Sequence, residues 1–111
     1  MTEIPSSICY YLNLKTLNLD NNKLKTVPIE ISNLKNLNFL ELSSNKLESL
    51  TDEICQLKKL KSLYIDTNNL QTLSYKIMDL YKHQLKTFDY FENKFPKNLL
   101  LQLKEIESFK K

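Results

Sequence analysis

The amino-acid sequence predicts an α/β solenoid with about four short parallel strands and a helix at its C-terminal end. Three observations carry this prediction. A string of leucines that ends in asparagine recurs along the chain, mostly with a period of 23 residues. Within each string, apolar residues alternate over a short L-x-L segment, as they do in a strand with one buried face. After Pro96 the apolar residues follow a helical spacing instead.

The recurring string is L-x-x-L-x-L-x-x-N-x-L, and the chain contains it four times. The first copy begins at Leu14, the second at Leu37 and the third at Leu60. The fourth begins at Leu85, two residues later than the period requires, which indicates an insertion near Tyr81–Gln84. A single unit cannot bury its own row of leucines, so neighbouring units must stack to complete a core.

An asparagine closes each copy of the string. Its amide can pair with backbone groups of the neighbouring turns, which would otherwise have no partner. We therefore predict a structural ladder of asparagines with no role in ligand binding. Its members are Asn22, Asn45, Asn68 and Asn93.

Residues 1–111 are predicted to form a single domain. Its parts are a partial N-terminal repeat, the repeats themselves and a C-terminal helical cap: residues 1–13, 14–95 and 96–111. We expect the cap helix to cover residues 98–110, with Asn98 as its N-cap. A partner-binding amphipathic helix is the alternative interpretation of this segment.

The N-terminal end begins half-way through a unit, so the strand around Leu14–Leu19 is expected to be a sheet edge with part of its leucine row exposed. Edges of this kind are usually covered. We expect a larger assembly to cover this end at Ile4, Ile8 and residues 10–12. The alternative is that Ser6–Leu12 folds back and seals the edge.

The repeated pattern resembles the leucine-rich-repeat family, specifically the 23-residue intracellular type with L-P-x-x-I-x-x-L in the second half of each unit. The resemblance covers roughly residues 4–95. It implies an arc whose strands line the concave face, with the variable positions of each string pointing into the hollow. It also implies a protein–protein interaction module.

Three aromatic residues interrupt an otherwise polar set of concave positions, and acidic residues lie around them. Aromatic anchors among polar groups are typical of interface hot spots. The alternative is that these aromatics merely reflect a chain rich in Tyr and Phe. The predicted partner-binding residues are Asn18, Asp20, Phe39, Glu41, Tyr64, Asp66, Asp89, Phe91 and Glu92.

Catalysis is not expected. The only histidine, His83, falls in the insertion, and no second His or Cys is spaced to make a zinc site with it. The chain has no glycine, hence no glycine-rich phosphate loop. We therefore predict no enzyme activity, no metal and no cofactor.

The net charge of +3 is mild, and all sixteen basic residues are Lys. We expect an acidic, aromatic inner face and a basic outer face, and a partner with a basic or mixed surface. The alternative function is an accessory subunit of a large ribonucleoprotein such as the ribosome, with outer lysines on RNA phosphates. No signal peptide or membrane-spanning stretch is visible, and two cysteines suggest a reducing compartment. We expect a cytoplasmic location, with the nucleus as the alternative.

Overall fold

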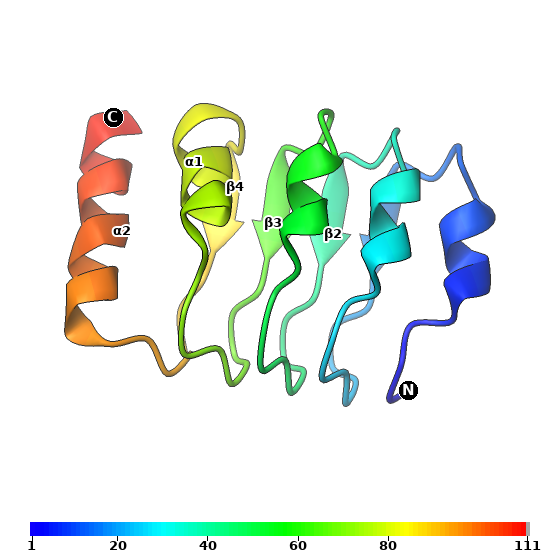
Figure 1. Ribbon diagram of the computed structural model, residues 1–111, viewed down its shortest axis with the longest axis horizontal. Coiled ribbons are helices and arrows are strands. Elements are labelled where there is room, and N and C mark those ends of the chain that lie inside the picture. The colour runs from blue at the N-terminus through cyan, green and yellow to red at the C-terminus, as the bar shows by residue number, and fades with distance from the viewer. Residues whose placement is uncertain (111) are drawn as a thin grey trace.

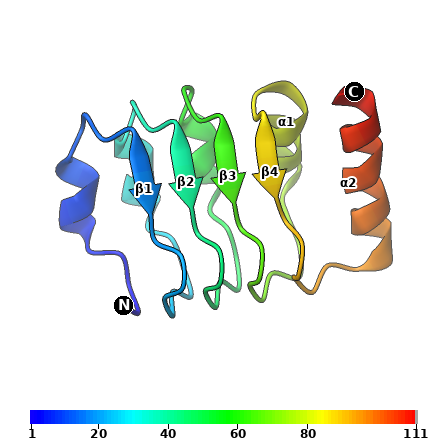
Figure 2. The same cartoon turned by 180° about the vertical axis from the view of Figure 1, so that it is seen from behind.

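The computed structural model describes residues 1–110, and in it each repeat forms one rung of a solenoid (Figure 1). The strands form one parallel sheet in the order β1-β2-β3-β4, and this sheet faces the viewer in Figure 2. Their bounds are β1 Thr16–Asn18, β2 Phe39–Glu41, β3 Ser62–Tyr64 and β4 Thr87–Asp89. The predicted α/β solenoid is confirmed.

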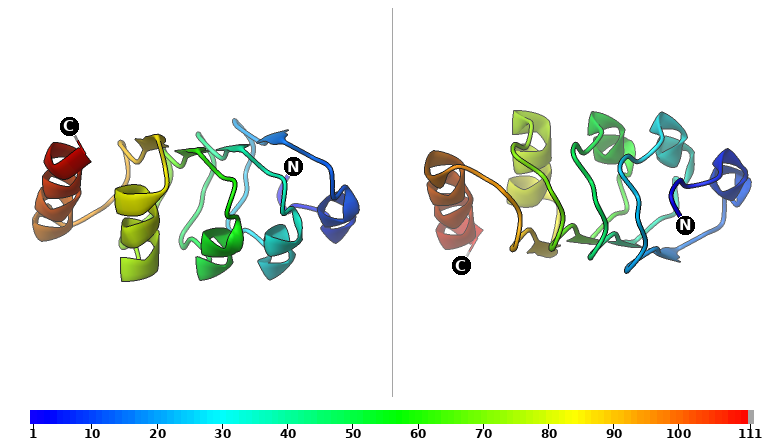
Figure 3. Two further views of the ribbon diagram at one scale, coloured as in Figure 1. Left: turned by 90° about the horizontal axis from the view of Figure 1, so that it is seen from above. Right: turned by 90° about the horizontal axis from the view of Figure 1, so that it is seen from below.

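A layer of helical segments lies behind the sheet, one to each rung (Figure 3). Three of them are short 3₁₀ helices: η1 Ser6–Tyr10, η2 Ile29–Asn33 and η3 Asp52–Gln56. The fourth is a true α-helix, α1 Tyr75–His83, and the Ser74 hydroxyl caps it by accepting from the Ile77 N–H. The extra length of α1 reflects the two inserted residues, which give this rung room for a full helix.

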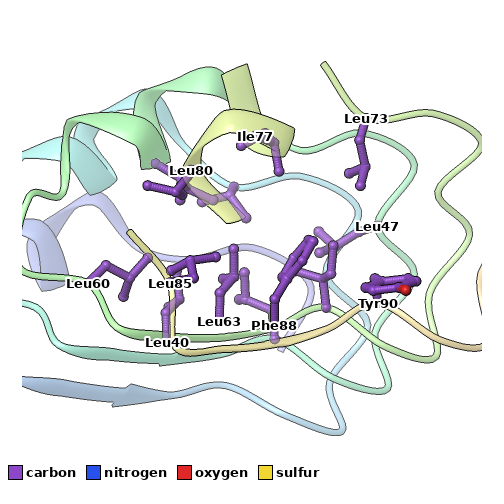
Figure 4. Close-up of a cluster of buried hydrophobic side chains, with 14 of the residues drawn as sticks. Leu40, Leu47, Leu60, Leu63, Leu73, Ile77, Leu80, Leu85, Phe88 and Tyr90 are labelled. Carbon is purple, nitrogen blue, oxygen red and sulfur yellow. The ribbon is translucent and has the colours of Figure 1, made fainter. Parts of the chain in front are cut away.

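Leucines fill the space between the two layers. Register pairs Leu17 with Leu40, Leu40 with Leu63 and Leu63 with Phe88, so one buried column runs the length of the sheet (Figure 4). Leu40 and Leu63 have no exposed surface, and burying such a side chain contributes about 1.5–3 kcal/mol. Stacking therefore supplies the core that no single rung could form.

The last rung replaces leucines by aromatic residues. Phe88 packs against Tyr81 and Tyr90, with ring centroids 4.9 and 5.4 Å apart. All three rings are buried. Since Tyr81 lies near the end of α1, the lengthened helix packs as one unit with Phe88 in β4 and with Tyr90, which follows this strand.

The C-terminal helix, α2 Lys97–Lys110, buries Leu99 and Leu103 in the core. It begins one residue earlier than predicted because the Pro96 carbonyl accepts hydrogen bonds from the N–H groups of Leu99 and Leu100. The expected N-cap at Asn98 is therefore wrong, since Asn98 lies inside the first turn. Among residues 1–110, no helix combines the length and apolar character needed to cross a bilayer.

At the opposite end, Ile4 and Cys9 are buried and Ile8 is half-buried beside the first rung. Leu17 and Leu19 are only 8% and 7% exposed, so the expected exposure of the first leucine row is wrong for both. The partial repeat covers this row from the helical side, while β1 is the end strand of the sheet, as expected. Residues 10–12 are themselves exposed.

Candidate functional site

The outward side chains of the sheet form two rows across the concave face, because side chains alternate along each strand and neighbouring strands are in register. The first row holds Thr16, Phe39, Ser62 and Thr87. The second row holds Asn18, Glu41, Tyr64 and Asp89. Four of the nine predicted partner-binding residues therefore share one row.

Phe39 and Tyr64 form an aromatic pair near the middle of this face. They are diagonal neighbours, since Phe39 lies opposite Ser62, and their ring centroids are 5.3 Å apart at an interplanar angle of 43°. Both side chains are half-buried. A tilted pair of this kind contributes about 0.5–1.5 kcal/mol beyond its buried area, so the two rings hold each other in place and still present apolar surface.

Phe91 lies apart from the two strands that carry this pair. It follows the end of β4, is 58% exposed and stacks on Tyr90 with centroids 4.9 Å apart. It therefore extends the candidate surface toward the turn of the last rung.

Two acidic residues lie close to strand ends: Glu41 is the last residue of β2, and Asp66 follows the end of β3. The Ser43 hydroxyl hydrogen-bonds to the carboxylates of Glu41, in its own rung, and of Asp66, in the next rung. A hydroxyl has one proton to donate, so it serves one carboxylate at a time. The shared hydroxyl keeps two acids close together on the concave face.

Some of the predicted site residues also stabilise the turn that follows their own strand. The side-chain oxygens of Asn18 and Asp89 accept from backbone N–H groups two residues further on, at 3.1 and 3.3 Å. These bonds are the short local pairs typical of Asx turns. The position before each ladder asparagine is left-handed, with φ of 55–56°, and Glu92 occupies it in the last rung.

Lysines occupy the N-terminal ends of the same strands. Lys15, Lys61 and Lys86 directly precede β1, β3 and β4, and their backbone groups continue the sheet register. Basic residues therefore precede three of the strands, whereas the acids Glu41, Asp66 and Asp89 lie at or just after strand ends.

A family model described as a leucine-rich repeat region matches residues 5–110. The chain belongs to the leucine-rich-repeat family. The predicted resemblance is thus confirmed over nearly the whole chain. Proteins with leucine-rich repeats generally act in protein–protein interaction and are typically non-catalytic.

The solved structure of a leucine-rich-repeat protein from Leptospira interrogans matches this chain with 35% sequence identity and a TM-score of 0.82. The match covers 97% of this chain and 27% of that one. This leucine-rich-repeat chain therefore spans 27% of the length of its structural relative. No match was found among curated proteins.

Residues 1–110 of this leucine-rich-repeat chain offer few groups suited to metal binding or nucleophilic catalysis. Among residues 1–110, no three His, Cys, Asp or Glu side chains are grouped so that they could hold a metal ion. Burial raises the pKa of the Cys9 thiol, with Glu30 adding to the rise, and burial also raises the pKa of the Cys55 thiol. Both groups therefore stay protonated at neutral pH, whereas nucleophiles and metal ligands need the thiolate.

Gln84 has a structural role that the repeat pattern did not predict. Its side-chain amide donates to the carbonyl oxygens of Leu57 and Leu60, in the preceding leucine-rich repeat, at 2.8 and 2.9 Å. Asn36 holds the same place in its repeat and donates to the Leu12 carbonyl at 3.0 Å. An amide side chain just before the first leucine of a unit is the sequence signal that could have revealed this link.

Proposed function

We propose that this chain is a non-catalytic protein–protein interaction module, a small adaptor or subunit, that binds its partner through the concave face. The observation that carries the proposal is the Phe39–Tyr64 pair, which places two half-buried rings next to the carboxylates of Glu41 and Asp66. Such anchors cost little side-chain entropy on binding, because packing has already fixed their positions.

The charge pattern along the strands indicates what kind of partner surface would fit. A segment that lies along the strands would place basic groups over the acidic strand ends and an apolar side chain on the two rings. Its other end would meet Lys15, Lys61 and Lys86, where acidic or polar groups fit best. We therefore propose a partner with a mixed surface, bound in one orientation, within a larger assembly in the cytoplasm.

The test is partner capture from the native cell with tagged full-length protein and quantitative mass spectrometry. Phe39→Ala and Tyr64→Ala should each weaken binding of the captured partner by more than about 1 kcal/mol, which corresponds to about five-fold in affinity. Thr87→Ala is the matched control, because Thr87 is exposed on the same face in the last rung.

Melting temperatures of the three variants separate loss of contact from loss of fold. Folded Phe39→Ala and Tyr64→Ala variants that bind as well as wild type would show that the partner docks elsewhere. Equal loss in Thr87→Ala would show a general defect of the sheet instead.

Lys15, Lys61 and Lys86, at the strand starts, favour a second function, an accessory subunit of a large ribonucleoprotein such as the ribosome. Lysines at the strand starts and on the outer side offer positive charge to RNA phosphates without reading the sequence. This function predicts capture that RNase abolishes and that weakens steeply with salt, since each phosphate contact releases counterions. Capture that is insensitive to RNase and to salt would exclude it.

A further inference from the structure

A groove of about 450 Å³ lies between α1 and α2, at the C-terminal end of the helical layer. Figure 1 shows the two helices side by side, with α1 in the helical layer and α2 at the C-terminal end of the solenoid. Tyr75, Met78 and Asp79 line it from α1, and Glu105, Ile106 and Phe109 line it from α2. This surface is separate from the concave face.

The groove depends on features that the earlier rungs lack. Their helical segments are 3₁₀ turns of five residues, whereas α1 has nine residues and α2 has fourteen. Each of these two helices therefore presents a stripe with helical spacing, at residues 75, 78, 79 and 82 and at residues 102, 105, 106 and 109. Two facing stripes of this kind form a seat into which a third helix can pack.

The floor of the groove is apolar and its ends carry aromatic rings. Met78 and Ile106 are half-buried and pack against the core. Tyr75 and Phe109 are 71% and 63% exposed, so most of each ring is open to a partner. Covering these four side chains would remove a continuous strip of apolar surface from water.

The charged side chains that line the groove indicate what kind of helix would bind there. Asp79 and Glu105 line the groove from opposite helices, and both are exposed. Lys82 is the one cation that residues 1–110 contribute to the lining, and its Nζ lies 4.6 Å from the centre of the Phe109 ring, as a cation–π contact requires. The lining thus has one negative charge in excess, and Phe109 already attracts a cation.

We propose that this groove receives a basic amphipathic helix of a partner protein. The helix would lay leucine-like side chains over Met78 and Ile106 and place Lys or Arg beside Asp79 and Glu105. This is helix-in-groove recognition, in which one apolar stripe anchors the helix and flanking charges fix its orientation. The site is independent of the concave-face proposal, so the chain would have one docking surface on the sheet and a second one between α1 and α2.

The probe is a synthetic amphipathic peptide of Leu and Lys, about 18 residues long so that it can form a stable helix. Titration into ¹⁵N-labelled full-length protein, followed by NMR, should shift amide signals of residues 75–82 and 102–109. A peptide with Glu in place of every Lys should bind at least about five-fold more weakly. A peptide with the same Leu and Lys in scrambled order should lose the localised shifts.

Glu105→Lys should weaken binding of the Lys peptide by about five-fold or more. Glu107→Lys is the matched control, because Glu107 is exposed on the same helix but does not line the groove. Tyr75→Ala, at an exposed position, should also weaken binding without altering the fold.

Three results would overturn the proposal. They are equal binding of the Glu peptide, equal effects of Glu105→Lys and Glu107→Lys, and shifts that fall on the concave face. Shifts that appear on concentrating the protein without peptide would assign the groove to a second copy of this chain and would also overturn it.

Discussion

The side-chain oxygen of Asn45 accepts a hydrogen bond of 3.0 Å from the backbone N–H of Leu24, which belongs to the preceding rung. The nitrogen of the same side chain donates to the Leu19 carbonyl of that rung, also at 3.0 Å. Asn68 repeats this arrangement with Leu47 and Leu42. Asn22 differs, because its amide nitrogen donates to carbonyl oxygens of its own turn.

Asn45→Ala should destabilise the fold by about 1–3 kcal/mol, because it leaves the buried Leu24 N–H without a partner. Asn22→Ala should cost clearly less, since its bonds lie within one turn and it is only half-buried. Urea unfolding followed by circular dichroism measures both. Equal losses in the two variants would argue against a link between rungs.

Thr67→Gly should raise the free energy of unfolding by about 0.5–1 kcal/mol. Thr67 has a φ of 56°, and in this left-handed region a β-branched residue costs about 1–2 kcal/mol whereas glycine costs nothing. Glycine loses more chain entropy on folding, about 0.5–1 kcal/mol, which reduces the net gain. Thr87→Gly lies in β4 and should lower stability by about 0.5–1 kcal/mol. Chemical denaturation of both variants checks the opposite signs, and a loss in both would contradict the argument.

Gln84→Ala should cost about 1–3 kcal/mol, because the carbonyl groups of Leu57 and Leu60 lose their donor in a partly buried place. Gln71→Ala removes the same kind of side chain from an exposed position and should stay near wild type. Melting temperatures give the comparison. A Gln84→Ala variant as stable as Gln71→Ala would mean that water replaces the lost bonds.

The stability of the fold should fall at alkaline pH. Burial, with smaller contributions from neighbouring groups, raises the pKa of Tyr90 to about 12, from an ordinary value of 10.0. The folded state therefore favours the neutral phenol. This contribution is complete below pH 10 and is lost as the pH rises toward 12, by up to about 1.4 kcal/mol per pH unit.

Tyr90→Phe should remove this part of the pH dependence while it leaves stability near neutral pH little changed. Urea unfolding between pH 9 and pH 12 measures the difference. Tyr10→Phe, at a ring that is 74% exposed, should follow the wild-type curve. A Tyr90→Phe curve that runs parallel to wild type would refute this prediction.

Much of the fold follows from the repeated string. The buried columns through Leu17, Leu40 and Leu63 follow from alternation and a fixed period, because both features encode which side of a strand is buried. The predicted start of α2 was wrong by one residue. The Pro96 carbonyl, and not the Asn98 side chain, accepts the first hydrogen bonds of the helix. The period does not determine the kind of helix in each rung. The first three rungs have 3₁₀ helices of five residues, whereas the rung with the insertion has an α-helix of nine residues.

The candidate sites were harder to predict. The repeat frame places Phe39 and Tyr64 on one face, but their ring contact depends on rotamers that spacing does not determine. The repeat frame places Lys61 and Lys86 just before their strands, and the hydrogen bond from the Lys86 N–H to the Lys61 carbonyl shows that they are neighbours. The groove between α1 and α2 was hidden, because it arises from an insertion and a terminal helix that lie outside the period.

The buried aromatic rings of this chain sit at one end. Tyr81, Phe88, Tyr90 and Phe95 are buried in or beside the last rung, the rings of Tyr10 and Tyr11 at the other end are exposed, and the chain has no Trp. Near-ultraviolet dichroism arises from aromatic rings held in fixed surroundings, so it should come mainly from the C-terminal end, with a smaller part from the half-buried Phe39–Tyr64 pair. Far-ultraviolet dichroism samples the backbone of every rung. A difference between the midpoints of the two melting curves would show whether the C-terminal end unfolds before or after the other rungs, without any added label.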